Sequence, residues 1–314
     1  HEVLYLKADQ AAEQLVNIAQ FFEEPFGNSS AMAAYFCAHF AKSQGTETLL
    51  AGDGGDELFA GNSHYAKQKQ FELFYRLPRS LRYLFRLIFS NRVASRIPLL
   101  GKAASYIRQA DVPLPDRLGT YNFVQQYGVD QMFNGDFLKR VNCQEPALQQ
   151  RARYLECSSA NPVDRMLYLD WKFTLADNDL VKVKKMCELA GVTVHFPLLD
   201  KKVVDFSCRI PADMKLPGHK LRSFYKEACR GFLPDDTLSK SKHGFGLPFG
   251  VWMKENERLM QLTKDCLESF RARDIIKGSL IDNTLRSHSS IHAGYYGELI
   301  WIIVTLELWL QRES

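Results

Sequence analysis

The sequence predicts a helix-rich α/β fold in which many helices pack around a small, partial parallel sheet. A short apolar run at residues 49–51 stops at a Gly/Asp cluster, as a buried strand does when it enters a tight loop. Long stretches on both sides of it repeat apolar residues at the spacing of amphipathic helices. With 314 residues, 46% of them hydrophobic and 24% charged, the chain is long enough for one large domain or two small ones with a packed core.

The N-terminal elements follow from apolar spacing and from residues that stop helices. Residues 2–6 are predicted to form an edge strand. Residues 9–22 carry one apolar helical face, made of Ala12, Leu15, Ile18, Ala19 and Phe22. Pro25 ends that helix, and Asn28 or Ser29 can cap the next one, which runs to about Lys42. The strand at residues 48–51 comes next.

A strongly basic segment follows, since residues 73–110 contain no acidic and eight basic residues. One face of the predicted basic helix, within residues 76–108, carries Arg79, Arg82 and Arg86. Its other face carries Leu77, Leu81, Leu84, Phe85 and Ile88. A helix packed on the core with a solvated basic face is the favoured interpretation; an interfacial helix or a patch for an acidic partner is the alternative. The prolines and glycines of residues 73–115 predict that this segment is a basic helical insertion.

The second half of the chain reads mostly as helices. Residues 163–190 are predicted to form one or two helices, and Pro211 and Pro217 frame a loop. Residues 220–232 are predicted to form a basic helix. Residues 240–248 form a Gly-rich loop, and two further helices close the chain.

The loop after residue 51 combines residues that suit a metal and a phosphate. Gly52, Gly54 and Gly55 let the backbone approach a bulky anion closely. Asp53 and Asp56 are hard oxygen ligands, and Mg²⁺ usually binds one or two carboxylates together with substrate phosphates. A plain turn with solvated carboxylates has the same spacing, so the loop by itself leaves both interpretations open.

Four motifs in order resemble the glutamine-dependent asparagine synthetase family. They are E-P-F-G-N-S-S at 24–30, L-L-A-G-D-G-G-D-E-L-F-A-G at 49–61, the segment 177–200 ending in F-P-L-L-D, and K-S-K-H-G-F-G-L-P at 240–248. Trp309 lies in a matching C-terminal helix. The resemblance covers nearly the whole chain, with residues 66–160 matching loosely. It implies one synthetase-like domain over 1–314, with a partial parallel sheet of the adenine-nucleotide alpha-hydrolase (pyrophosphatase-loop) type.

Two features of the family are not found in this sequence. Family members begin with a glutaminase domain whose N-terminal Cys is the nucleophile, and their synthetase domain opens with an S-G-G-x-D-S loop. The chain instead begins at His1. We therefore expect an N-terminally incomplete piece of a synthetase, and we expect it to be inactive in isolation.

The resemblance implies an ATP- and Mg²⁺-dependent ligase. A carboxylate, aspartate or another small molecule, would attack the α-phosphate of ATP, and ammonia derived from glutamine would then displace AMP. Catalysis of such a displacement rests mostly on positioning and electrostatics. A homodimer is an expected assembly. A non-catalytic scaffold derived from the family is the alternative from another class, and retention of both phosphate elements favours the enzyme.

The resemblance also assigns roles to single residues. Asp56 is the expected Mg²⁺ ligand, and Asp53 is its partner or a base near the incoming amine. Lys242 is the cation expected on the phosphates or on the developing oxyanion, with Lys240 as its substitute. Glu57 is expected to be a carboxylate favoured by the helix dipole.

Further nucleotide-binding residues are expected on two helices. Asn28, Ser29 and Ser30 lie at a helix start, where free N–H groups favour anions and where plain capping is the alternative. Arg222 and Lys226 lie on the basic helix, where the family places cations and where a solvated face is the alternative.

Three positions depart from the family pattern. Lys184 replaces an acid, and Thr193 and His195 replace a charged pair. A site for a small zwitterion needs partners for both of its charges. These changes predict an acceptor other than aspartate, such as a sugar acid, unless the three positions only brace the core or face solvent.

Composition excludes several other classes. A net charge of +4 gives little support to a nucleic-acid partner. The longest apolar stretch, residues 299–310, contains Glu307 and is too short to span a bilayer. The seven cysteines include no C-x-x-C pair, so buried reduced thiols in a cytoplasmic protein are expected.

Overall fold

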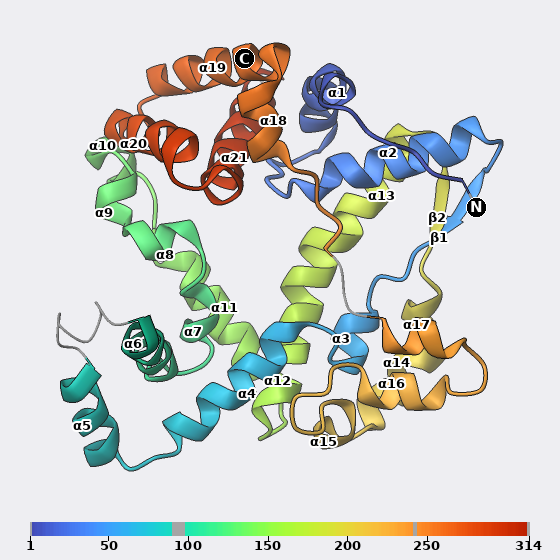
Figure 1. Cartoon of the computed structure of the whole chain (residues 1–314), viewed down its shortest axis with the longest axis vertical. Coiled ribbons are helices and arrows are strands. Elements are labelled where there is room, and N and C mark those ends of the chain that lie inside the picture. Colours follow the sequence, from blue (N-terminus) through green and yellow to red (C-terminus); the bar gives the residue numbers. More distant parts are fainter. Residues whose placement is uncertain (1, 90–97, 241–243, 313–314) are drawn as a thin grey trace.

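Helices dominate the computed structural model, which describes residues 2–89, 98–240 and 244–312 (Figure 1). In the first half of the chain the helices are α1 (Ala8–Phe21), α2 (Ser30–Ser43), α3 (Gly55–Phe59), α4 (Ser63–Tyr75), α5 (Arg79–Phe89), α6 (Pro98–Ala110), α7 (Asp116–Gly119), α8 (Phe123–Tyr127), α9 (Val129–Met132), α10 (Gly135–Leu138) and α11 (Glu145–Glu156). In the second half they are α12 (Pro162–Asp170), η2 (Trp171–Asp179), α13 (Leu180–Leu189), η3 (Pro197–Leu199), α14 (Lys201–Arg209), α15 (Ala212–Lys215), α16 (Ser223–Ala228), α17 (Asp235–Ser239), α18 (Phe249–Glu255), α19 (Glu257–Ala272), α20 (Gly278–Ser290) and α21 (Ala293–Arg312).

Two parallel strands form the sheet in the described part of the chain, β1 (Thr48–Leu50) and β2 (Thr193–His195). Thr48 pairs with Thr193 and Leu50 with His195. The ladder continues one residue further, where Ala51 N–H donates to the His195 carbonyl at 2.9 Å. Because the strands are parallel, the loops that leave their carboxyl ends lie beside each other. The helix-rich α/β class and the position of the predicted strand at 48–51 are confirmed. The prediction that this strand is buried is wrong, because Leu50 is 73% exposed and Leu49 is half-buried.

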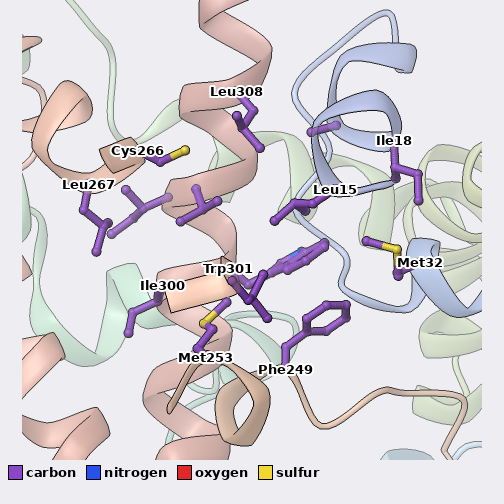
Figure 2. Close-up of a cluster of buried hydrophobic side chains, with 14 of the residues drawn as sticks. Leu15, Ile18, Met32, Phe249, Met253, Cys266, Leu267, Ile300, Trp301 and Leu308 are labelled. Carbon is purple, nitrogen blue, oxygen red and sulfur yellow. The ribbon is translucent and has the colours of Figure 1, made fainter. Parts of the chain in front are cut away.

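The largest hydrophobic core joins the two ends of the chain. Helices α1 and α2 pack against α18 to α21, with Trp301 fully buried and its ring 4.4 Å from that of Phe249 (Figure 2). Glu307 of α21 is also fully buried; its carboxylate accepts from Arg273 at 2.5 Å and from Ser269 at 2.6 Å. A buried carboxylate needs such hydrogen-bond partners. These contacts therefore fix the position of α21 in the core and its rotation about its own axis.

Helix α21 also bears on the predicted absence of a membrane span. The helix has 20 residues and is long and apolar enough to cross a bilayer, judged by length and composition alone. By that criterion, the prediction that the apolar stretch at 299–310 is too short to span a bilayer is wrong. Half of its most apolar window is buried inside the protein. Its apolar character is therefore explained by the core.

Three other predictions about elements are wrong. Residues 2–6 are extended but form no strand, and Val3 and Tyr5 are 53% and 83% exposed. An edge strand needs a neighbouring strand to pair with, and a short apolar run does not supply one. The predicted basic helix at 220–232 shrinks to α16, because Arg222 is left-handed at φ 54° and begins a new helix. Four helices, α18 to α21, close the chain where two were expected.

Residues 162–189 form one unbroken helical run of α12, η2 and α13, as predicted for 163–190. Its middle part, η2, has the wider turns of a π-helix, a feature found frequently at functional sites. Asp170, at the entry to η2, is buried and accepts from Tyr65 Oη at 2.6 Å and Thr174 Oγ1 at 3.0 Å. The run thereby ties α4 to the segment that carries Asp179 and Lys182.

The basic segment forms α5 and α6, which lie at one corner of the molecule (Figure 1). Phe85 and Phe89 of α5 pack beside a small core made of Phe71, Phe74, Ile107 and Ala110. Leu81, Leu84 and Ile88 do not pack there and are 43%, 50% and 53% exposed. The favoured interpretation, a helix packed on the core with a solvated basic face, is therefore met only in part. Whether residues 73–115 are an insertion stays a prediction.

All seven cysteines are free thiols, as predicted. Only Cys187 and Cys266 are buried, whereas Cys37, Cys143 and Cys208 are exposed. The expectation that the thiols are buried is thus only partly met.

Candidate functional site

The glycine loop between β1 and α3 has a backbone that other residues cannot easily adopt. Gly54 has φ +89°, and a Cβ at this position would lie 2.2 Å from Leu199 Cδ2 of η3. Both the left-handed backbone and the close approach therefore require glycine. A Cβ on Gly52 would meet nothing within 4 Å, so this part of the loop faces open space.

That open space is a pocket of about 820 Å³ at the carboxyl end of β1. The predicted residues that line it are Gly52, Asp53, Gly54, Gly55, Asp56 and Arg222. Sequence segments far apart along the chain complete its walls: α2 contributes Cys37, and the end of η2 with α13 contributes Asp179 and Lys182. A volume of this size suits a ligand of nucleotide dimensions.

Asp56 faces a cation across the pocket. Arg222 Nε lies 3.5 Å from Asp56 Oδ1. A Cβ on Gly61 would lie 1.8 Å from the same carboxylate oxygen, so glycine at position 61 leaves the room that this rotamer occupies. Arg222 is held in turn by its backbone, since its N–H donates to the Ala60 carbonyl at 3.2 Å. The motif at 49–61 thus positions both members of the pair.

Asp53 lies among charges of both signs. Burial raises the pKa of Asp53, the cation of Lys182 lowers it, and the carboxylates of Asp179 and Asp56 raise it. Lys182 Nζ lies 2.7 Å from Asp179 Oδ1. An acid with a raised pKa in a pocket is a candidate for proton transfer or metal binding.

Glu57 is more deeply placed than a helix-dipole carboxylate needs to be. It stands in the first turn of α3, as predicted, but it is only 8% exposed and lines the pocket. Burial, followed by the repulsion of Asp56, Asp170 and Asp179, raises its pKa to about 7. The side chain therefore changes protonation near neutral pH.

Asp53 and Asp56 suit Mg²⁺ as a partial ligand set. Across the described ranges, no group of three or more His, Cys, Asp or Glu side chains is placed to hold a metal ion. Two carboxylates in a pocket with cationic walls fit an ion that takes its other ligands from phosphates and water.

Asn28, Ser29 and Ser30 do not line this pocket. Asn28 Oδ1 accepts from Ser30 Oγ at 2.7 Å, and Asn28 Nδ2 donates to Asn178 at 3.1 Å. Ser29 Oγ donates to Glu298 at 3.1 Å. The bond to Asn178 fastens the start of α2 to the residue next to Asp179, and the bond to Glu298 fastens it to α21. A direct role in nucleotide binding stays a prediction for all three.

The predicted cations divide into two groups. Arg222 and the substitute Lys240 line the pocket, whereas Lys226 lies on α16 outside it. Lys242 lies outside the described residues, and its role stays a prediction. Asp179 and Lys182 were not predicted as site residues from the sequence, although both lie inside the third motif, at 177–200.

The three positions that depart from the family pattern lie outside the pocket lining. Lys184, Thr193 and His195 are exposed, the first on α13 and the others on β2. This placement agrees with the solvent-facing alternative stated for Lys184. The identity of the acceptor stays a prediction.

The family model described as asparagine synthase matches residues 1–311. The chain belongs to the asparagine synthase family. It is 25% identical over 309 residues to asparagine synthetase (glutamine-hydrolyzing) 1 of Bacillus subtilis strain 168, covering 97% of this chain and 46% of that protein. It is 24% identical over 320 residues to a putative asparagine synthetase (glutamine-hydrolyzing) of Mycobacterium tuberculosis H37Rv, covering 98% of this chain and 46% of that protein.

An archaeal relative matches a shorter stretch. A putative asparagine synthetase (glutamine-hydrolyzing) 2 of Methanocaldococcus jannaschii is 27% identical over 200 residues, which is 62% of this chain and 36% of that protein. The chain thus spans less than half the length of these curated relatives.

Proposed function

We propose that the chain is the synthetase part of an enzyme that activates a carboxylate with ATP and converts it into an amide. One observation carries this proposal: the glycine loop, the carboxylates of Asp53 and Asp56, and the cations of Lys182 and Arg222 meet in one pocket. Family membership supports the same reaction class. We further propose that β1 and β2 belong to a larger parallel sheet of the adenine-nucleotide alpha-hydrolase type.

The pocket residues fit a nucleotide with its metal. The backbone of residues 52–55 would hold the phosphates, because glycines at 52, 54 and 55 allow close approach. Asp56 would hold Mg²⁺ beside them, and the bound ion would supply neutralisation of phosphate charge. Lys182, Arg222 and Lys240 add positive charge from the other walls. We assign Lys242 to the same task from its motif.

The proposed reaction has two displacements. An oxygen of the acceptor carboxylate attacks the α-phosphorus of ATP, and the bond to pyrophosphate breaks. Ammonia then attacks the activated carbonyl carbon, AMP leaves, and the nitrogen loses a proton. The protein positions the reactants and stabilises charge in both steps.

Asp53 is the proposed acceptor of that proton. Its raised pKa brings it towards the range in which a carboxylate works as a base. Glu57, with a pKa of about 7, lines the same pocket and can take the proton onward. The cation of Lys182 opposes the effect of burial on the pKa of Asp53 and so favours its ionised form.

The proposed reaction also needs a source of ammonia and an acceptor carboxylate. We propose that a glutaminase domain elsewhere in the whole protein releases ammonia from glutamine, because the chain spans less than half of relatives named glutamine-hydrolyzing. The acceptor is a small-molecule carboxylate, with aspartate and sugar acids as the classes to compare.

The test is isotope exchange between ATP and labelled pyrophosphate, using the whole protein and a panel of carboxylates. Exchange that depends on one carboxylate identifies both adenylation and the acceptor. A whole protein that binds ATP but exchanges no pyrophosphate with any carboxylate would instead support the scaffold alternative.

A further inference from the structure

Among the described residues, the packing contacts that hold helix α5 on the protein come from one side of the helix. Phe85 and Phe89 pack beside the core formed by α4 and α6. Arg82 is turned inward, with 14% of its side chain exposed; it lies 3.3 Å from Asp111 and its guanidinium is 4.4 Å from the Tyr75 ring. Since these contacts set the rotation of the helix, the direction of its remaining side chains is also set.

Those remaining side chains include an apolar stripe that faces outward. Leu81, Leu84, Leu87 and Ile88 are 43%, 50%, 54% and 53% exposed. Leu81, Leu84 and Ile88 are three and seven residues apart, so they share one face of the helix. A contiguous exposed stripe of large apolar residues on a folded protein marks an interaction site.

The surroundings of the stripe are uniformly basic. The described residues 73–89 and 98–110 contain six basic and no acidic residues, and Arg76, Arg79 and Arg86 are exposed next to or within α5. The nearest acid that follows, Asp111, already pairs with Arg82 and Arg86. The occupant of this surface must therefore combine negative charge with an apolar layer.

We propose that the pair α5–α6 docks on an anionic membrane surface. Leu81, Leu84 and Ile88 would enter the boundary between headgroups and acyl chains, and the arginines would contact the lipid phosphates. A nucleic acid matches the charge but offers nothing to the leucine stripe. Figure 1 shows α5 and α6 at a corner of the molecule on the opposite side from β1 and β2, so a flat surface can reach them without covering the pocket.

Sedimentation with lipid vesicles tests the proposal on the whole protein. We expect binding to vesicles of roughly three parts phosphatidylcholine to one part phosphatidylglycerol, weakening as salt is added, and none to pure phosphatidylcholine. Two double variants separate the contributions. Arg76→Glu with Arg79→Glu should lower the partition coefficient roughly tenfold or more. Leu84→Ser with Ile88→Ser should lower it to a similar extent, roughly tenfold.

A matched control carries the same change in charge elsewhere. Arg140→Glu with Lys264→Glu alters two exposed bases, one just after α10 and one on α19, and should keep its binding. Figure 1 shows α10 and α19 in the upper part of the molecule, away from α5. Unchanged unfolding midpoints confirm that each variant is folded. Equal retention on anionic and neutral vesicles, or an equal loss in the control, would overturn the proposal. So would absence of vesicle binding together with a dimer that Leu84→Ser with Ile88→Ser dissociates.

Discussion

Arg222 Nε lies 3.5 Å from Asp56 Oδ1 across the pocket, although 165 residues separate the two along the chain. Gly61 makes this arrangement sterically accessible, and the left-handed backbone of Arg222 directs the guanidinium inward. The carboxylate that the sequence assigns to Mg²⁺ therefore already stands in the electrostatic field of a cation. Loss of either charge should change how the pocket receives phosphates.

Asp56→Asn should lower ATP–pyrophosphate exchange in the whole protein about a hundredfold. Removal of one preorganised charge contact typically costs about 3 kcal/mol in the transition state. The unfolding midpoint should change little, because asparagine keeps the shape. Asp136→Asn, at an exposed acid on α10, is the matched control and should exchange at the normal rate. Near-normal exchange in Asp56→Asn would show that the metal is held elsewhere.

Gly54→Ala should destabilise the fold by about 1 to 3 kcal/mol more than Gly45→Ala. Both glycines have positive φ, +89° and +81°, so both substitutions carry backbone strain. Only position 54 adds a collision, with Leu199 at 2.2 Å, whereas position 45 faces open space. Urea unfolding measures the difference. Leu199→Ala should recover part of the loss in a double variant, and equal losses at the two glycines would refute the steric argument.

Glu57 should make stability depend on pH in the apo protein. Because its pKa is raised from 4.5 to about 7, the folded chain keeps a proton that the unfolded chain releases. Its contribution is therefore complete below pH 4.5 and is lost as the pH rises towards 7, by up to about 3 kcal/mol.

Glu57→Gln should remove this part of the pH dependence. Urea unfolding at about pH 5 and about pH 8 measures it, and the decline in the free energy of unfolding should be smaller in the variant. Glu255→Gln, at an exposed glutamate that ends α18, should leave the decline unchanged. A wild-type decline that survives in Glu57→Gln would assign it to another group.

Lys182→Met should move the acidic limb of the ammonia-dependent reaction to higher pH. Lys182 lowers the pKa of Asp53 against the effect of burial, so loss of its cation raises that pKa further. Asp53 then accepts a proton only at higher pH. Lys185→Met removes a lysine from the same helix that pairs with Glu23 on the surface, and its profile should match the wild type. An unshifted limb in Lys182→Met would exclude Asp53 as the base.

The site residues that were predicted best are those that lie together in one contiguous sequence motif. Asp53, Asp56 and the glycines could be placed on a strand–loop–helix from their order alone. Asp179 and Lys182 enter the pocket because α13 packs against α2, a tertiary contact that spacing does not encode. The motif likewise gives the position of Lys184 but not which face of α13 is exposed, and the acceptor inferred from it stays a prediction. Residues 2–6 show that a short apolar run forms a strand only where a partner strand lies beside it.

The apolar face of α5 shows a different limit. Helical periodicity predicted an apolar and a basic face, but it could not tell which side chains of either face meet the core. Phe85 turns inward and Leu81 outward, and Arg82 turns inward with its acid partner Asp111. The assumption that an apolar face is a buried face failed at this helix.

Transfer of labelled oxygen from the acceptor carboxylate tests the central claim most directly. The whole protein is given ATP, ammonia and an acceptor with heavy oxygen in its carboxylate, and the phosphorus products are analysed by mass spectrometry. Attack on the α-phosphorus predicts AMP that carries one labelled oxygen, with unlabelled pyrophosphate. Label in inorganic phosphate together with ADP, or AMP without label, would contradict the proposed adenylation.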